Sequence, residues 1–195
     1  MIRALLLVLL TAALAGCTAP ETLSAADVDI ERLTGTLEPA ETVSLMRLRI
    51  PELGIDAPLQ DLWRDGVGVL VPPPVTEPDK VGWYAEGVVP GDVGPALIAG
   101  HVSGRPAGAT ESVPGVFARL GELDAGDRVV VVRDGRELVF EVYQRGSYRK
   151  DAFPTEEVYG NRPGPEVVLV TCGGAFDPAA HSYESNVIAF ARQIS

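Results

Sequence analysis

Proline and glycine punctuate this chain so often that it has little room for long helices. The sequence contains 16 prolines and 21 glycines in 195 residues, and the patterned segments between them have the length of strands. No stretch keeps the apolar spacing of a long amphipathic helix. The chain therefore favours an all-β fold, in which short strands and frequent turns build one closed or nearly closed barrel.

Six segments carry a strand pattern, and two of them form a predicted hairpin around the Arg-Asp-Gly turn at 133–135. Only residues 114–123 have a helical pattern, with Pro114 at its start and Gly121 near its end. The expected strands are residues 44–50, 96–100, 128–132, 137–143, 166–170 and 186–192.

The N-terminus has the pattern of an export signal. Arg3 precedes an almost entirely apolar run at 4–15, which is shorter than the ~20 residues of a membrane-spanning helix. The run ends on Leu-Ala-Gly-Cys, a lipobox-like motif. Residues 1–16 are therefore expected to be a lipoprotein-type signal peptide, with Cys17 as the lipidated residue. A plain signal peptide and an uncleaved anchor are the alternatives. In each case the body of the protein is exported. As a lipoprotein it is expected at the outer face of the cytoplasmic membrane or the cell surface.

Two regions are expected after the signal. Residues 17–42 are polar, acidic and weakly periodic, which is typical of a spacer between a lipid anchor and a domain. Residues 43–195 remain, and about 150 residues suffice for one domain with a substantial core.

Charge and composition exclude several function classes. The formal net charge is −11, with only 16 Lys and Arg residues, so nucleic-acid binding has no electrostatic support. Two histidines and one cysteine outside the signal region make a zinc site unfavourable, and neither a metal nor a cofactor is expected. If Cys17 carries a lipid, Cys172 has no disulfide partner within the chain.

Cys172 closes the apolar run 166–170 and precedes Gly173 and Gly174. A buried structural thiol and a reactive nucleophile are both consistent with this position, although paired glycines also let a substrate backbone approach. A nucleophilic cysteine needs a proton-transfer partner. His101 stands where an apolar strand meets a polar loop, whereas His181 lies in a polar connection typical of solvated surface. His101 is the favoured partner.

Several stretches, in this order, resemble the sortases of Gram-positive bacteria, and most closely the class F sortases of actinobacteria. The similarity covers about residues 43–195. The pairing of Ala-Gly-His with Val-Thr-Cys-Gly-Gly is its most specific part. The matching stretches are GPALIAGHVSG, VFARLGELDAGDRVVV, FPTEEVYG, VVLVTCGGAFD and SYESNVIAFAR.

The resemblance implies a closed eight-stranded β-barrel with one or two short helices. It also implies cleavage of an LPXTG-like sorting signal after its threonine, through a thioester on Cys172, with transfer to an amine such as a peptidoglycan precursor. His101 becomes the proton-transfer residue. Thr171 is expected to orient the substrate or its loop, and the backbone near Gly173 to donate hydrogen bonds to the oxyanion.

One departure from the family pattern concerns an arginine at the start of the last strand. Asn186 occupies about that place, and no arginine lies between Cys172 and Arg192. An asparagine donates only neutral hydrogen bonds, which are about half as strong as charge-assisted ones. Three arginines elsewhere remain candidates for the missing charge, and the sequence does not choose among Arg119, Arg145 and Arg149.

The sequence leaves two further questions open. A sortase-fold module that binds a peptide without turnover would use the same residues, and so would a peptide hydrolase. An L,D-transpeptidase fits less well, because the Ser-x-Gly-Cys arrangement of those enzymes is missing. The segments 101–115 and 70–87 are either walls of a peptide groove or ordinary surface loops.

Overall fold

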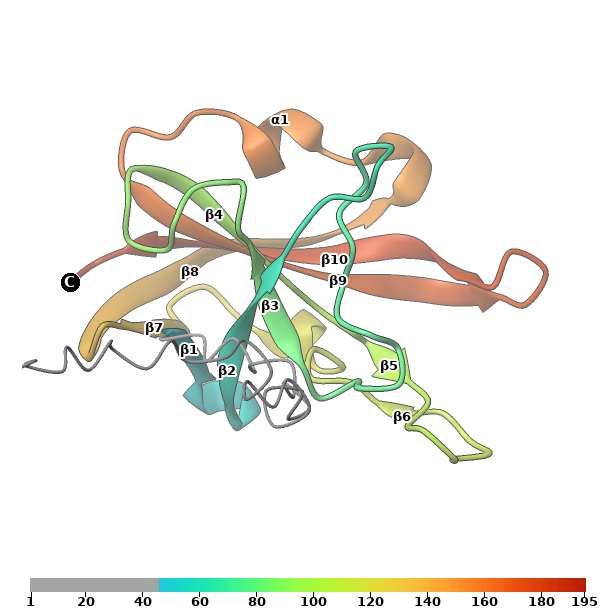
Figure 1. Ribbon diagram of the computed structural model, residues 1–195. Helices are drawn as coiled ribbons and strands as arrows, with labels where there is room; N and C mark the ends of the chain where they lie inside the picture. Colours follow the sequence, from blue (N-terminus) through green and yellow to red (C-terminus); the bar gives the residue numbers. More distant parts are fainter. Residues whose placement is uncertain (1–45) are drawn as a thin grey trace, which may run out of the picture. The chain divides into compact units, whose positions relative to one another are not determined.

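The computed structural model describes residues 46–195, so the expected signal peptide, the spacer and Cys17 lie outside the described residues. Eight strands form the main body: β1 (Met46–Ile50), β2 (Ile55–Leu62), β3 (Val81–Tyr84), β4 (Gly94–Gly100), β7 (Arg128–Arg133), β8 (Arg136–Arg149), β9 (Pro165–Asp177) and β10 (Ser182–Gln193). They close into a barrel in the order β1-β2-β3-β4-β9-β10-β8-β7 (Figure 1). The expected all-β fold with a closed eight-stranded barrel is confirmed.

The remaining elements are short. β5 (Ser103–Gly104) and β6 (Val113–Pro114) pair as a small ribbon beside the barrel, and α1 (Thr155–Tyr159) is the one α-helix of the described residues. Single 3-10 turns complete the list: η2 (Pro51–Leu53), η3 (Leu120–Glu122) and η4 (Lys150–Ala152). Nowhere in residues 46–195 does a helix have the length and apolarity needed to span a membrane.

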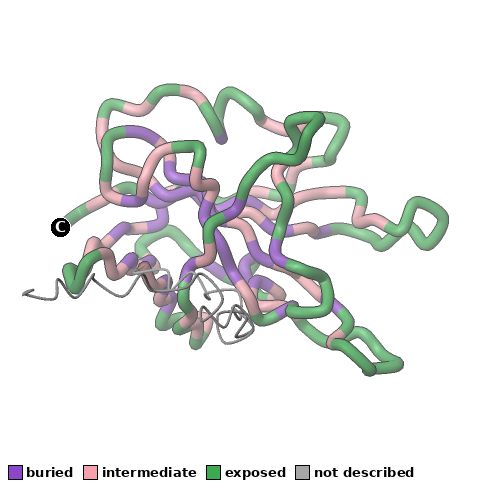
Figure 2. The backbone as a smooth tube through the Cα atoms, in the orientation of Figure 1, coloured by how far each residue is buried: buried purple, intermediate pink, exposed green. Residues whose placement is uncertain are grey.

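β9 is continuously apolar from Val167 to Val170 because both of its faces are covered there. It pairs in parallel with β4 and antiparallel with β10. Val167 and Leu169 belong to the cluster inside the barrel, whereas Val168 packs outside, against a cluster that includes Val158 of α1. Burying each such side chain contributes roughly 1.5–3 kcal/mol. Figure 2 shows the buried residues along the central strands and the exposed ones in the loops and the outer end of the β9–β10 hairpin.

The expected helix at 114–123 is wrong for most of its length. Pro114 belongs to the β5–β6 ribbon, and only η3 is helical. The segment instead makes successive turns, in which Ala118 bonds to Gly115 and Leu120 bonds to Phe117. Phe117 and Leu120 are fully buried in the barrel core, so tertiary packing holds this backbone away from the α-helical path.

Candidate active site

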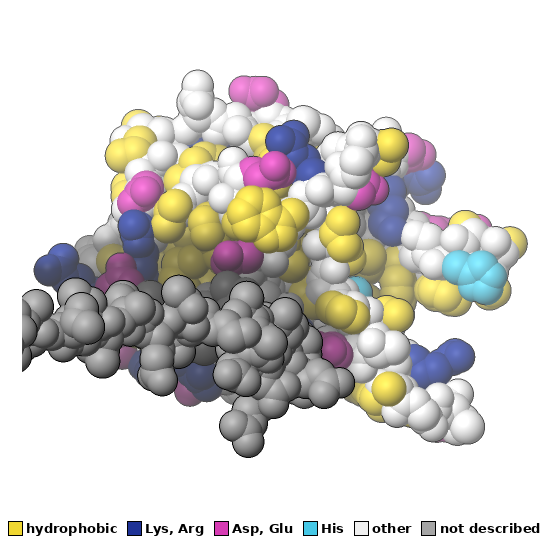
Figure 3. All heavy atoms as spheres, viewed as in Figure 1, with side chains coloured by type: hydrophobic (Ala, Val, Ile, Leu, Met, Phe, Trp, Pro, Cys, Tyr) yellow, Lys and Arg dark blue, Asp and Glu magenta, His cyan; other side chains and the backbone are white. Residues whose placement is uncertain are grey.

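A cavity of about 800 Å³ opens beside the last residues of β4 and the middle of β9. Figure 3 shows it as a hollow between two projecting arms, which are the β9–β10 hairpin and the β5–β6 segment of Figure 1. Both expected loops contribute to its walls. The lining residues are Val75, Thr76, His101, Val102, Ser103, Gly104, Arg105, Ser112, Cys172, Phe176, His181, Ser182 and Tyr183.

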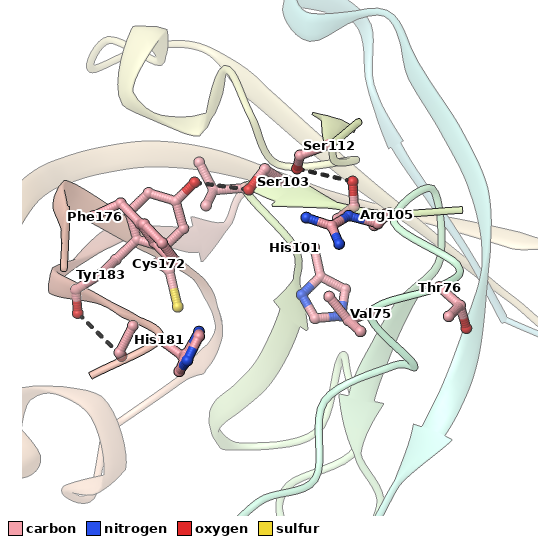
Figure 4. A pocket seen from close by; sticks show the side chains of 13 residues that line it. Val75, Thr76, His101, Ser103, Arg105, Ser112, Cys172, Phe176, His181 and Tyr183 are labelled. Carbon is pink, nitrogen blue, oxygen red and sulfur yellow. Dashed lines mark hydrogen bonds between the residues drawn. The ribbon is translucent and has the colours of Figure 1, made fainter. Parts of the chain in front are cut away.

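Cys172 lies within β9 rather than at its end, because the strand continues to Asp177. Side chains alternate along a strand, so Cys172 shares the outer face with Val168 and Val170, whereas Leu169 and Thr171 point into the barrel. The thiol is free and half-buried. The sulfur therefore points out of the barrel and into the cavity (Figure 4).

The two glycines after Cys172 have separate structural reasons. Gly173 is buried, and a Cβ there would come within 2.7 Å of a methyl group of Val187. Gly174 has φ = 77°, a left-handed conformation that suits glycine. At this point β9 places two residues opposite the single Glu184 of β10, which is a β-bulge. The bulge bends the hairpin, whose outer residues then reach the cavity.

His101 follows β4 directly and is held on several sides. Its Nε2 lies 2.6 Å from the carbonyl oxygen of Pro73. Since a carbonyl oxygen only accepts hydrogen bonds, Nε2 carries the hydrogen, and Nδ1 is the nitrogen free to exchange protons. The backbone of His101 accepts a hydrogen bond from Phe117 at 2.9 Å. The imidazole is thus oriented before any substrate arrives.

Residues 72–78 form a segment that we call the proline strap. It is fixed to the cavity wall by His101 at Pro73, by the backbone N–H of Arg105 at Val75 (3.0 Å), and by that of Val116 at Pro78 (2.7 Å). These three bonds make the strap part of the cavity, where Val75 and Thr76 line it.

Thr171 joins the strand of the thiol to the strand of the imidazole. Its side chain is buried inside the barrel, and its Oγ1 donates a 2.8 Å hydrogen bond to the carbonyl oxygen of Gly100. Thr171 precedes Cys172 and Gly100 precedes His101. A buried bond of this kind contributes about 1 kcal/mol, and here it also ties together the two strands that carry Cys172 and His101.

Gly115 makes the approach to His101 possible, and its replacement is expected to damage the site. A Cβ at Gly115 would lie 2.6 Å from the carbonyl carbon of His101 and would overlap the carbonyl oxygen. Gly115→Ala should therefore displace His101, lowering kcat/KM by about 10²-fold and the free energy of unfolding by about 1–3 kcal/mol.

The matched control for that prediction is Gly121→Ala, because a Cβ at Gly121 meets nothing within 4 Å. Both variants are compared by thermal unfolding and by the kinetics of the LPXTG-like peptide cleavage that the sequence resemblance implies. Equal kinetics for the two variants would show that the contact with His101 has no role in placing the imidazole.

Asn186 stands directly opposite Cys172 in the β9–β10 register, so the two side chains share one face of the sheet. It is half-buried and is not among the residues that line the cavity. Gly173 and Thr171 do not line it either. These three residues lie beside or beneath the thiol rather than across the cavity from it.

None of the three arginines considered from the sequence reaches the cavity. Arg119 pairs with Glu122, Arg149 pairs with Asp151, and Arg145 donates to the carbonyl oxygen of Leu123. The hydrogen bonds from Arg119 and Arg149 hold the pKa of the two carboxyls below their usual values. These guanidiniums are engaged elsewhere.

The cavity contains two basic residues that sequence reasoning did not place there. His181, expected in a solvated connection, is exposed but lines the cavity from the β9–β10 turn, where its φ is 48°. Arg105 lines it from the segment after β5. The sequence signal that could have found them is their position in short polar segments: Arg105 follows His101 closely, and His181 follows Cys172.

The two arms meet across one end of the cavity. The Tyr183 hydroxyl and Ser103 Oγ lie 2.7 Å apart in a hydrogen bond, and the Tyr183 ring stands edge-on to Phe176 with centroids 5.1 Å apart. This aromatic wall gives an apolar surface above the thiol. Residues 46–195 contain no group of three or more His, Cys, Asp or Glu side chains that could hold a metal ion.

A closed β-barrel whose open cavity is lined by an unpaired thiol and an oriented imidazole has the two groups that a cysteine-nucleophile enzyme needs. Residues 48–194 match the family described as the sortase domain, which is most of the chain. The protein belongs to the sortase family and is a sortase-type cysteine transpeptidase. A comparison with curated protein sequences gives no significant match.

Solved sortase structures share the fold at low sequence identity. A lid mutant of sortase A from Corynebacterium diphtheriae aligns with TM-score 0.57 and 19% identity, over 78% of this chain and 70% of that one. Sortase C-1 from Actinomyces oris gives TM-score 0.59 and 19% identity, over 78% and 75%. Sortase C1 from Streptococcus agalactiae gives 0.57 and 19%, over 78% and 68%. These likenesses concern the barrel itself.

Proposed function

We propose that the protein cleaves an LPXTG-like sorting signal after its threonine and transfers the acyl fragment to an amine, with Cys172 as nucleophile and His101 as proton-transfer residue. The observation that carries this proposal is the convergence of both side chains on one cavity of about 800 Å³ in a sortase barrel. That volume lies within the usual range for ligand sites, roughly 300–1,000 Å³.

The first half of the reaction makes the thioester. The thiolate of Cys172 attacks the carbonyl carbon of the Thr–Gly bond, and the developing oxyanion needs hydrogen-bond donors. The backbone around Cys172 and Gly173 and the side chain of Asn186, which faces the same side of the sheet, are the proposed donors. As the C–N bond breaks, His101 gives a proton to the departing amine.

The second half reverses these roles. The entering amine loses a proton to His101, its nitrogen attacks the thioester carbonyl, and the C–S bond breaks to regenerate the thiolate. Because Nε2 of His101 is held by Pro73, both protons pass through Nδ1. The apolar wall of Phe176 and Tyr183 suits the apolar leucine and proline of such a signal.

We also propose where the protein acts and which partners it meets. Residues 1–16 would direct export, and a lipid on Cys17 would hold the domain, through the spacer 17–42, at the outer face of the cytoplasmic membrane. There it would meet the sorting signals of secreted proteins and an amine acceptor such as a peptidoglycan precursor. The lipobox-like end of the apolar run supports this placement.

The test is mass spectrometry of products after mixing the protein with a library of LPXTG-like peptides and several amines. The expected product is an amide that joins the peptide, up to its threonine, to an added amine. A product ending in a free carboxyl, whatever amine is present, would identify a hydrolase. Unchanged peptides that nevertheless bind would identify a binding module.

A further inference from the structure

The cavity differs in charge from the rest of the protein. The chain carries 27 Asp and Glu residues and a net charge of −11, yet no Asp or Glu of residues 46–195 lines the cavity. Its lining includes both histidines of the chain, His101 and His181, together with Arg105. Arg105 gives this cavity a fixed positive charge, and a positively charged concave site attracts anionic ligands.

Among residues 46–195, Arg105 has an exposed side chain and forms no ion pair with a carboxylate. Most other arginines there are paired, as Arg64 is with Glu86 and Arg133 with Asp92. A guanidinium presents a fixed fork of donors that matches a carboxylate. An unpaired one inside a cavity is therefore available to a carboxylate that arrives with a ligand.

The proline strap locates Arg105 relative to His101. His101 bonds to Pro73 and the backbone of Arg105 bonds to Val75, two residues further along the strap. Two residues span at most about 7 Å of chain. Figure 4 shows the guanidinium on the His101 side of the cavity, with the sulfur of Cys172 across from it. The backbone of Arg105 is thus anchored on the wall that holds the proton-transfer group.

The amine component of the proposed reaction must approach that same wall. Both the departing and the entering nitrogen exchange a proton with His101, whereas the acyl carbon is bound to the sulfur of Cys172. A group carried close to the reacting nitrogen therefore lies nearer to Arg105 than a group on the acyl side does.

We infer that Arg105 binds a carboxylate on the amine acceptor, so that the preferred acceptor is an amine with an acidic group near its reacting nitrogen, as in an acidic peptide. This inference rests on the proposed function and names the chemistry of its second substrate. The carboxylate orients the acceptor for attack on the thioester, and Arg105 acts as a specificity-determining residue.

The experiment compares two acceptors that differ only in one charge, Gly-Glu-Gly-amide and Gly-Gln-Gly-amide. The donor is an LPXTG-like peptide whose leaving segment is uncharged, so that only the acceptor carries the tested carboxylate. The wild-type protein should use the Glu acceptor with a kcat/KM about fivefold higher. Added salt should shrink that ratio, because the cavity is open to solvent.

Three variants isolate the role of Arg105. Arg105→Gln should bring the ratio close to one, and Arg105→Glu should reverse it. Arg136→Gln removes the same charge from an exposed residue at the β7–β8 turn, outside the cavity, and should keep the wild-type ratio. Thermal unfolding of each variant reports whether it is folded.

Thioester formation is measured in the same samples and separates the two possible failures. A wild-type protein that forms the thioester but uses both acceptors equally overturns this inference alone. A preference that survives in Arg105→Gln also overturns it. A wild-type protein that forms no thioester overturns the proposed function, and this inference with it.

Discussion

Cys172→Ala is expected to lose cleavage and transfer of an LPXTG-like peptide by at least about 10⁴-fold, because the variant has no sulfur to carry the acyl group. The barrel should not be affected. Cys172 lies on the outer face of β9, half-buried, so that removal of its sulfur opens no cavity in the core. Peptide cleavage measured by chromatography checks the first expectation, and thermal unfolding checks the second.

Cys172→Ser is the matched control for that substitution. It keeps the size of the side chain and replaces the thiol with a hydroxyl, which is a far weaker nucleophile at neutral pH. Both variants should be folded and inactive. Cleavage by either variant at more than about one-hundredth of the wild-type rate would mean that another group carries the acyl fragment.

His101→Ala is expected to have the second largest effect, a loss of about 10²–10⁴-fold in kcat/KM, which is typical of a missing acid–base group. The variant also loses the hydrogen bond to Pro73. The loss should appear in both halves of the reaction, since the same imidazole serves both. Single-turnover measurements of thioester formation and of its resolution by an amine check the two halves separately.

His181→Asn is the comparison for His101→Ala, because the two histidines line the same cavity. Asparagine tolerates the left-handed backbone that His181 adopts at φ = 48°, so the turn is preserved. We expect a loss below tenfold. If His181→Asn instead lost as much activity as His101→Ala, the proton-transfer role would have to be assigned to the hairpin rather than to the strand.

The barrel could be predicted from the sequence because its strands carry their own patterns. The hairpin around Asp134 and the doubly covered run at 166–170 appear close to their predicted places. β2 and β3 were not predicted. β2 contains Pro58, a residue normally kept out of paired strands, and β3 lies in the segment 70–87 that was interpreted as a groove wall or a loop. The expected helix at 114–123 failed because buried Phe117 and the contact of Gly115 with His101 determine that backbone.

The cavity could be predicted only in part. The sequence pointed to Cys172 and His101, and the structure shows that the two residues preceding them, Thr171 and Gly100, are joined by a hydrogen bond. Arg105 and His181 enter the cavity through the β5–β6 ribbon and the bulge at Gly174. Neither feature has a sequence period, so neither could be foreseen from apolar patterning.

The proposed reaction requires that an acyl fragment becomes attached to one particular sulfur, that of Cys172. Intact-protein mass spectrometry, after rapid mixing with an LPXTG-like peptide and acid quenching, measures that attachment. We predict a mass gain equal to the peptide fragment ending in threonine, located on Cys172 and removed by hydroxylamine. An unmodified protein in a mixture where the peptide has been cut, or an adduct on another residue, would contradict the account.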